Sequence, residues 1–253
     1  MKIRLHQFLS RSGIFSSKKM VKEAIWSGSI SVNGSIVKDI AFQFNPATKA
    51  VAYNGEQLTL PESQAHYLLN KPKGYICSRL SAEEKNLGKQ SIYELFESSV
   101  SQSVYERLVT VGRLDEDTTG FLLVTTDGNI VHKITSPQQL ISKTYRVETM
   151  NVISESDAVQ IEQGMEISVE EQGRTETYTT RPAHLQFESN RSIYLTIDEG
   201  KKRQIRRMFS HLDNEVVELH RVSTERMQLD DYALDEAEFC TISTEDIHRL
   251  ILD

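Results

Sequence analysis

The sequence predicts an α+β protein of two domains, in which a small N-terminal domain precedes a larger one with a mixed, mainly antiparallel β-sheet flanked by helices. Its 253 residues exceed the size of one typical domain, and a polar segment containing Pro61 separates two patterned regions. In the second region, strand and helix patterns alternate without a regular βαβ period. We place the first domain at 1–60, a linker at 61–66 and the second domain at 67–253.

The composition excludes several classes of protein. Hydrophobic residues make up 38% and charged residues 26%, as in ordinary soluble proteins. Apolar stretches stay far short of the roughly 18 residues of a membrane span, and the N-terminus has no secretory apolar core. We therefore expect a cytoplasmic protein without membrane contact. Cys77 and Cys240 are the only cysteines, so neither a disulfide framework nor a CxxC metal site is available.

Charge is distributed unevenly along the chain. The net charge is −7, yet residues 1–60 hold eight Lys/Arg against three Asp/Glu. Residues 222–253 hold two against nine. A basic block on an acidic protein is a local attractor for phosphate, although a solvated basic surface explains the charge equally well.

The first domain reads as two short helices and a hairpin. Leu5, Phe8 and Leu9 form an apolar helical stripe that should end near Ser12-Gly13. The next segment, 29–37, alternates around an Asn-Gly pair, which indicates a β-hairpin.

Between them, Ser16-Ser17 can cap a helix over Lys18–Ser27. Lys18, Lys19 and Lys22 cluster near its start, where the helix dipole disfavours cations unless an anion is the neighbour.

This arrangement resembles the S4 (αL) RNA-binding domain over roughly residues 2–60. His6 departs from the pattern, as does Lys18, where Arg is common. The resemblance implies that this domain binds RNA, with Arg4, Lys18, Lys19 and Lys22 as candidate contacts. The matching residues are Arg4-Leu5, Phe8-Leu9, Ser16-Ser17-Lys18, Ile25, Gly28 and Ile30-Ser31-Val32-Asn33-Gly34.

The second domain shows a series of strand and helix patterns after the linker. Residues 67–77 suggest two short strands around a Lys-Pro-Lys-Gly turn, 79–91 a polar loop, and 91–96 a helix. Further strands are expected at 122–125, 143–150, 177–184 and 193–197, with helices at 157–164 and 204–212. The acidic C-terminal segment, 225–253, should pack with one solvated face.

The most informative stretch is 111–128, a polar loop bounded by Gly and followed by a buried strand and an Asp-Gly turn. It holds one arginine, Arg113, and three carboxylates, Asp115, Glu116 and Asp117, and loops anchored on core strands often carry function. From the residues alone, an ordinary Gly-bounded turn is the favoured interpretation. A calcium loop is weaker still, since further spaced oxygen ligands are missing.

A second stretch, 199–209, is strongly basic. Five of the eight residues from Gly200 to Arg207 are cationic. If 204–212 is helical, Arg206 can point along the sheet edge, where it would keep a nearby carboxylate ionised. A solvated basic helix start is the alternative.

These stretches are similar to the signature of the RsuA branch of the pseudouridine synthases. The likeness, together with the S4-like domain, spans almost the whole chain; Phe121 and the long loop 79–91 depart from it. Besides Gly112–Gly128, the matching blocks are Asn70–Gly74, Ile134–Pro137, Lys143–Val147, Gln204–Phe209 and Val217–Arg221.

The resemblance implies an isomerase that converts uridine to pseudouridine, which changes neither redox state nor mass and so needs no cofactor. Asp115 is implied as the nucleophile, with Arg206 as its ion-pair partner. Tyr145 is implied to stack on the base and help remove the C5 proton. Without the resemblance, a core tyrosine would be the better interpretation.

The resemblance also implies that several Lys and Arg side chains contact the RNA. Arg113 would enter the RNA where the uridine leaves the stack. The other candidates in this domain are Lys201, Lys202 and Arg203, and more weakly Lys71 and Arg221, which surface salt bridges explain equally well.

The expected substrate is one uridine of 16S ribosomal RNA, free or in a partly assembled small subunit, and the expected state is a monomer. A 23S rRNA enzyme of the same family, or a non-catalytic ribosome-assembly factor, remains an alternative. Scattered histidines and the absence of phosphate-binding Gly motifs argue against metal- and nucleotide-dependent chemistry.

Overall fold

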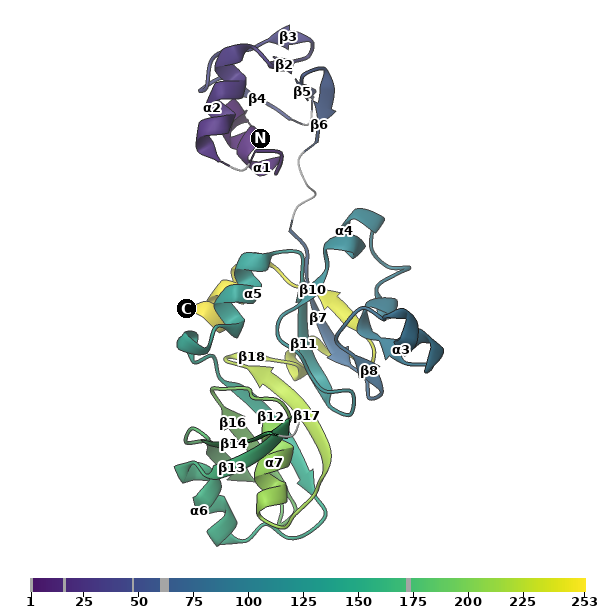
Figure 1. Cartoon of the computed structure of the whole chain (residues 1–253), viewed down its shortest axis with the longest axis vertical. Helices are drawn as coiled ribbons and strands as arrows, with labels where there is room; N and C mark the ends of the chain where they lie inside the picture. The colour runs from purple at the N-terminus through teal and green to yellow at the C-terminus, as the bar shows by residue number, and fades with distance from the viewer. Residues whose placement is uncertain (1, 16, 47, 60–63, 172–173) are drawn as a thin grey trace. The chain divides into compact units, whose positions relative to one another are not determined.

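The computed structural model of the chain describes residues 2–15, 17–46, 48–59, 64–171 and 174–253, without the side chains of 169–176. It consists of two compact units, Met1–Ser63 and Gln64–Asp253 (Figure 1). Ala65 and His66, assigned to the linker from sequence, belong to the second unit: Ala65 exchanges hydrogen bonds with Thr126, and His66 begins a strand. Residues 61–63, half of that linker, and residue 60 before it lie outside the described part.

The first unit packs two helices against small sheets. Helices α1 (Leu5–Arg11) and α2 (Lys18–Ser27) agree with the predicted spans. A four-stranded antiparallel sheet has the order β3-β2-β5-β6, and a separate two-stranded sheet joins β1 and β4. The strands are β1 (Ile3–Arg4), β2 (Ile30–Val32), β3 (Ser35–Ile36), β4 (Gln43–Phe44), β5 (Val51–Tyr53) and β6 (Glu56–Leu58).

Local chemistry explains these elements. The Ser17 hydroxyl accepts a hydrogen bond from the Met20 amide and caps α2; Ser16 lies outside the described residues. Gly28 ends α2 at φ +84°, and Asn33 and Gly34 both have positive φ, as a two-residue hairpin turn requires. The apolar stripe of α1 is fully buried, so the unit has its own core.

The second unit is built on a sheet of nine strands, in agreement with the predicted mixed and mainly antiparallel architecture. Seven follow the order β15-β16-β12-β17-β11-β7-β19, and β10 and β18 pair at its sides. Only β11 and β17 pair in parallel within this sheet, as far as the structure describes it. The strands are β7 (His66–Lys71), β10 (Val109–Thr110), β11 (Thr119–Thr125), β12 (Lys143–Thr149), β15 (His184–Phe187), β16 (Ser192–Ile197), β17 (Val216–Thr224), β18 (Met227–Gln228) and β19 (Phe239–Thr241).

Two hydrophobic cores cover the faces of this sheet. Leu122 and Val124 of β11 point into one core, while Phe121 and Leu123 point into the other. Helices α4 (Gln102–Arg107), α6 (Glu155–Gln163) and α7 (Gln204–His211) contribute to the first core. Helices α5 (Gly128–Thr135) and α8 (Thr244–Ile247) contribute to the second.

Several predicted elements were wrong in detail. The Asp-Gly pair at 127–128 is no turn: the Asp127 carboxylate accepts from the Asn129 amide and caps α5. The loop 79–91 contains helix α3 (Ala82–Asn86), with a Ser81–Glu84 capping box, and strand β9 (Gln90–Ser91), which pairs with β8 (Tyr75–Ile76). Residues 92–95 form a single 3₁₀ turn.

The strand expected over 177–184 is likewise two strands. β14 (Arg174–Thr179) forms a hairpin with β13 (Glu166–Glu171), and β15 starts only at His184 in the main sheet. The acidic C-terminal segment packs as expected, since Met227, Leu229 and Ile251 are buried. No helix among the described residues combines the length and apolar character needed to cross a membrane.

Candidate active site

The loop Val111–Thr118 joins β10 to the central strand β11. Gly112 has φ +75°, and the Thr118 amide donates to the carbonyl of Asp115 at 3.1 Å, which closes a tight turn around Asp115. Leu114 is buried and anchors the loop in the core. The turn leaves the Asp115 side chain partly exposed at the wall of a cavity.

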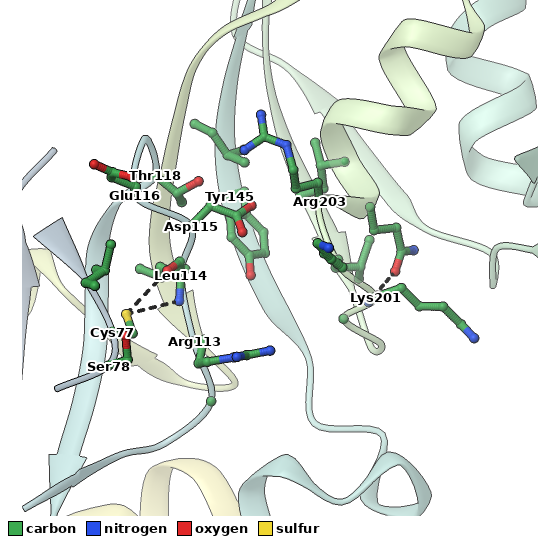
Figure 2. Close-up of a pocket in the computed structure, with 18 residues that line it drawn as sticks. Cys77, Ser78, Arg113, Leu114, Asp115, Glu116, Thr118, Tyr145, Lys201 and Arg203 are labelled. Atoms are coloured by element: carbon green, nitrogen blue, oxygen red, sulfur yellow. Dashed lines mark hydrogen bonds between the residues drawn. The ribbon is translucent and has the colours of Figure 1, made fainter. Parts of the chain in front are cut away.

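Cys77 fixes the backbone immediately before Asp115. Its thiol donates to the carbonyl of Leu114 at 3.3 Å, and the Leu114 amide lies 3.4 Å from Sγ (Figure 2). Burial raises the pKa of the Cys77 thiol, which keeps the proton for this bond. The Cys77 side chain thus holds the loop in place.

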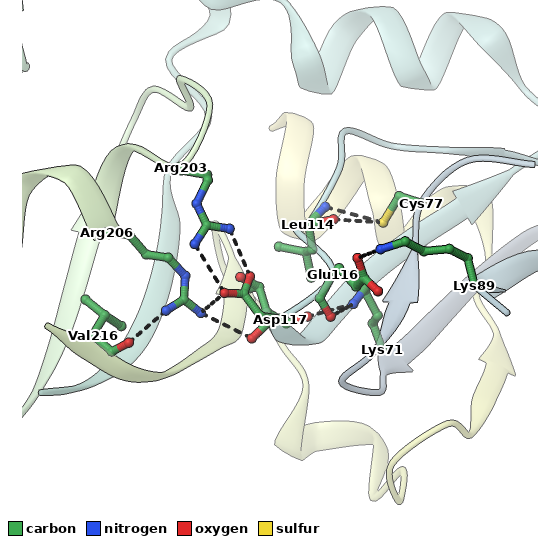
Figure 3. Close-up of polar contacts among 10 residues, drawn as sticks. Lys71, Cys77, Lys89, Leu114, Glu116, Asp117, Arg203, Arg206 and Val216 are labelled. Atoms are coloured by element: carbon green, nitrogen blue, oxygen red, sulfur yellow. Dashed lines mark hydrogen bonds and ion pairs between the residues drawn. The ribbon is translucent and has the colours of Figure 1, made fainter. Parts of the chain in front are cut away.

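Lys71 supports the other end of the loop. Its ammonium group is fully buried and donates to the carbonyl oxygens of Pro72, Glu116 and Thr118, at 3.0, 3.4 and 2.8 Å (Figure 3). Burial of Lys71 contradicts both predictions made for it, contact with an RNA phosphate and a surface salt bridge. A buried cation surrounded by carbonyls acts on the conformation of the loop.

Asp117 lies between two arginines at the start of α7. The Arg203 guanidinium approaches both carboxylate oxygens at 3.3 Å, and Arg206 Nη2 is 3.1 Å from Oδ2. Arg206 also donates to the carbonyls of Asp117 and Val216 (Figure 3). Burial tends to raise the pKa of Asp117, but the hydrogen bonds from Arg203 and the charge of Arg206 outweigh it and lower the pKa.

The predicted ion pair between Arg206 and Asp115 is therefore wrong: Arg206 pairs with Asp117. Asp115 acts on Arg206 only through space, by favouring its charged form. The reason lies in the turn, which directs the two carboxylates to different places. Asp117 is bound by α7, whereas Asp115 forms no ion pair within the described part of the chain.

Tyr145 lies on β12, in the middle of the sheet. Its cross-strand neighbours are Leu195 on β16 and Arg221 on β17. The ring is buried in the first core, yet it lines the same cavity as Asp115. The sheet thus fixes an aromatic ring in the wall of the cavity to which the loop presents its carboxylate.

This cavity has a volume of about 520 Å³ and an electropositive rim. Arg113 comes from the loop, and Lys201, Lys202 and Arg203 come from the segment before α7 (Figure 2). All four side chains are exposed. The structure therefore brings together most of the residues predicted for the second domain, and their arrangement suits a polyanionic substrate with one group inserted beside Asp115.

A second cavity, of about 530 Å³, adjoins the first and shares Arg113, Tyr145 and Lys201 with it. Lys143, for which no role was predicted, lines it from β12. Burial and the charge of Arg221 lower the pKa of Lys143 to about 8. The alternation of Lys143 and Tyr145 along one strand was the available sequence signal.

Arg221 differs from its expected position at the surface. It is only 4% exposed, and its Nε donates to the carbonyl of Phe121 at 2.6 Å. Because Arg221 is buried, the predicted surface salt bridge is contradicted. Arg221 lines the second cavity, so it can contact only an RNA group that enters this cavity.

The cations predicted for the first unit are at its surface. Arg4, Lys18, Lys19 and Lys22 are exposed. Nowhere in the described residues do three His, Cys, Asp or Glu side chains gather as they would around a metal ion.

Two features define the class of protein: a helix–helix–hairpin unit with exposed lysines, and a sheet that presents a carboxylate and an aromatic ring in one basic cavity. Residues 65–211 match the family model described as RNA pseudouridylate synthase, and residues 3–47 match the S4 domain. The chain belongs to the RNA pseudouridylate synthase family and carries an S4 domain.

Known proteins align with nearly the whole chain. It is 35% identical to "Uncharacterized RNA pseudouridine synthase YtzG" of Bacillus subtilis, over 98% of each chain. It is 34% identical to "Ribosomal small subunit pseudouridine synthase A" of Salmonella typhimurium, over 90% of this chain and 92% of the relative. A solved structure, "Crystal structure of pseudouridylate synthase", matches with a TM-score of 0.64 and 32% identity, over 98% of this chain and 99% of the other. The predicted family and fold class are confirmed.

Proposed function

We propose that the protein isomerises one uridine of small-subunit ribosomal RNA to pseudouridine. The observation that carries the chemistry is that Asp115 and Tyr145 line one cavity with cations at its rim. The substrate class rests on the relatives named for the ribosomal small subunit, of which several match at 31–34% identity. In this proposal the enzyme acts in the cytoplasm, where ribosomal RNA is found, and as a monomer.

Asp115 is the nucleophile in this proposal. Its carboxylate is not occupied by an ion pair within the described part of the chain, and Cys77 and Lys71 hold the backbone on both sides of it. Positioning of this kind lowers the entropic part of the barrier, because the reacting oxygen is already near the bound nucleotide. The covalent step splits glycosidic bond cleavage and C–C bond formation into two easier reactions.

Tyr145 supplies the surface on which the target uracil stacks. An aromatic ring fixed in a sheet offers a rigid platform, and stacking on such a ring is tolerant of base identity. In this proposal its phenol also accepts or relays the proton that leaves C5. The adjoining Lys143, with a pKa of about 8, adds a group in the second cavity that exchanges protons near neutral pH.

Arg113, Lys201, Lys202 and Arg203 bind the backbone around the flipped nucleotide. A uridine inside an RNA helix is inaccessible to Asp115, so it must leave the stack first. Arg113 is exposed and lines both cavities, and in this proposal it fills the vacated position. The other three cations neutralise phosphates at the entrance.

The decisive experiment measures tritium release from transcripts labelled at C5 of uridine. A 16S rRNA fragment, free or in a partly assembled subunit, should be modified in preference to 23S rRNA and tRNA. Release mainly from 23S fragments would assign the large subunit instead. Binding without release from any transcript, together with an unchanged pseudouridine map of total RNA after gene deletion, would indicate a non-catalytic assembly factor.

A further inference from the structure

The single tryptophan of the chain, Trp26, lies on the outer face of the S4 unit. It belongs to α2, and its side chain is 57% exposed. The opposite face of α2 carries the buried Val21, Ala24 and Ile25, so Trp26 lies on the solvent face. A large aromatic side chain left in water at that place contributes nothing to the core of its unit.

Cations surround this ring on the same helix. Lys22 precedes Trp26 by four residues and Lys19 by seven, and both spacings place a side chain on the same face. Glu23 makes only a long, exposed contact with Lys19, at 3.9 Å, which leaves much of the positive charge available. Lys38 reaches the end of α2, where its side chain lies against Gly28.

The lysines are placed where the helix itself disfavours them. The first turn of α2 has no acidic residue, while Lys18 and Lys19 begin it and Lys22 follows. Cations near a helix N-terminus are repelled by the dipole. An anion along this face removes that repulsion, so charge complementarity points to a polyanion as the occupant.

We propose that Trp26 is a stacking platform for an unpaired nucleobase of the RNA, with Lys19 and Lys22 on the flanking phosphates. Base stacking on an aromatic ring beside cations is the general way in which proteins bind single-stranded nucleic acid. The S4 unit then does more than supply charge, since it selects RNA with a bulged or looped base near the helix that it contacts. This inference rests on the proposed action on RNA and deepens it.

Tryptophan fluorescence tests the proposal directly, because all tryptophan emission comes from Trp26. The full-length Asp115→Asn protein is titrated with a single-stranded RNA and with a duplex of the same length. We expect solvent-exposed emission in the free protein, and marked quenching by the single strand but little by the duplex. Emission that is already shielded from acrylamide in the free protein, or equal quenching by both RNAs, would overturn the proposal.

Affinity measurements separate stacking from charge. Trp26→Ala should weaken single-strand binding by about 5- to 150-fold, which corresponds to roughly 1–3 kcal/mol per stacked base, and Trp26→Phe should restore most of it. The loss should persist at high salt, unlike the loss in Lys22→Ala. The matched control is Met20→Ala, since Met20 is 45% exposed on the same helix. Equal binding by wild type and Trp26→Ala, or an equal loss in Met20→Ala, would contradict the platform.

Failure of this inference is distinguishable from failure of the proposed function. The control Met20→Ala should release tritium from C5 at the wild-type rate, because Met20 belongs to the unit without the loop 111–118 and has no proposed RNA contact. An inactive wild-type protein that still shows single-strand quenching would refute the proposed function alone. An active protein without quenching would refute the platform alone.

Discussion

Two aspartates of the loop before β11 differ in their surroundings, although one residue separates them. Asp117 is held by Arg203 and Arg206, while Asp115 lines the cavity without an ion-pair partner in the described part of the chain. Pairing with arginine keeps a carboxylate ionised, but the Asp117 oxygens are engaged by the two guanidinium groups and Asp117 does not line the cavity of Asp115. The geometry therefore assigns positioning to Asp117 and supports the proposed reaction at Asp115.

Replacement of Asp115 should separate chemistry from folding. Asp115→Asn keeps the shape but loses the nucleophilic oxygen, so turnover should be abolished. Asp115→Glu displaces the carboxylate by roughly 1 Å, which costs about 10²-fold or more. The side chain is not in the apolar core, so stability should change by about 1 kcal/mol or less. Pseudouridine formation and melting temperature are the measurements; substantial turnover of the Asn variant would refute the nucleophile.

Asp117→Asn should slow catalysis by loosening the loop, and its cost in stability should depend on pH. The pKa of Asp117 is lowered below 3.8 in the folded protein, so its ion pairs stabilise the fold above about pH 4. This contribution is lost as pH falls through the folded pKa. Urea unfolding should thus show a gap between wild type and variant at about pH 6 that shrinks at about pH 3. A gap of constant size would contradict the assigned ion pairs.

Lys143 predicts a dependence on pH in the same direction, but in an alkaline window. Its pKa in the folded protein is about 8, against about 10.4 in an unfolded chain, because burial and Arg221 disfavour its charge. Between these values the unfolded state binds more protons, so stability rises with pH. Lys143→Met lacks this gain. The stability of wild type relative to Lys143→Met should therefore increase from about pH 7.5 to about pH 9.5, and an unchanged difference would place the lysine in solvent.

At the scale of elements, the parallel pair of β11 and β17 lies directly after the loop that carries Asp115. Gly120 faces Arg221 across this pair and has φ +97°. A Cβ at this position would overlap the carbonyl oxygen of Arg221, which is backbone and cannot move aside. The glycine is thus required by the close approach of the strands.

Gly120→Ala should consequently separate the strands and destabilise the protein by more than the roughly 1–3 kcal/mol of backbone strain alone. Gly88→Ala is the matched control, since Gly88 also has positive φ but open space around its Cβ position. Denaturant unfolding of both variants measures the difference. Similar losses in the two proteins would show that strand approach is unimportant.

Elements with a complete local signal were predictable from sequence. α2 has a capping serine, an apolar stripe and a terminal glycine, and its bounds agree with the prediction. The pair Asp127-Gly128 is equally typical of a turn and of the start of a helix. A helix forms because it buries Ile130 and Ile134 in the second core. Strand β17 was not predicted as an element, because its pairing partners β11 and β12 are distant in sequence.

The residues of the site were predicted in part. Asp115, Tyr145 and the cations before α7 were identified through the family resemblance, and the structure places them around one cavity. The ion-pair partner of Arg206 was not predicted correctly. The turn closed by the Thr118 amide decides whether Asp115 or Asp117 faces Arg206, and this turn is not evident from the sequence. Burial of Lys71 was equally hidden, since its acceptors are backbone carbonyls.

At the scale of the whole molecule, each unit has its own hydrophobic core. The loop 111–118 and the two cavities beside it lie entirely within Gln64–Asp253. The exposed lysines of α2 and Trp26 lie within Met1–Ser63. This separation implies that affinity for RNA and chemistry can be changed independently.

Removal of residues 1–60 should therefore raise the RNA concentration needed for half-maximal turnover and leave the rate at saturation nearly unchanged. Each RNA phosphate that the shortened protein no longer neutralises keeps its counterions, so the slope of log affinity against log salt should become shallower by about 0.7–0.9 per phosphate. Full-length protein with Lys18, Lys19 and Lys22 all changed to Ala should lie between wild type and the truncated protein, because it keeps Arg4 and Trp26. Equal affinity and salt dependence of the truncated and full-length proteins would show that the second unit binds RNA on its own, and the lysines at the start of α2 would then be a solvated surface.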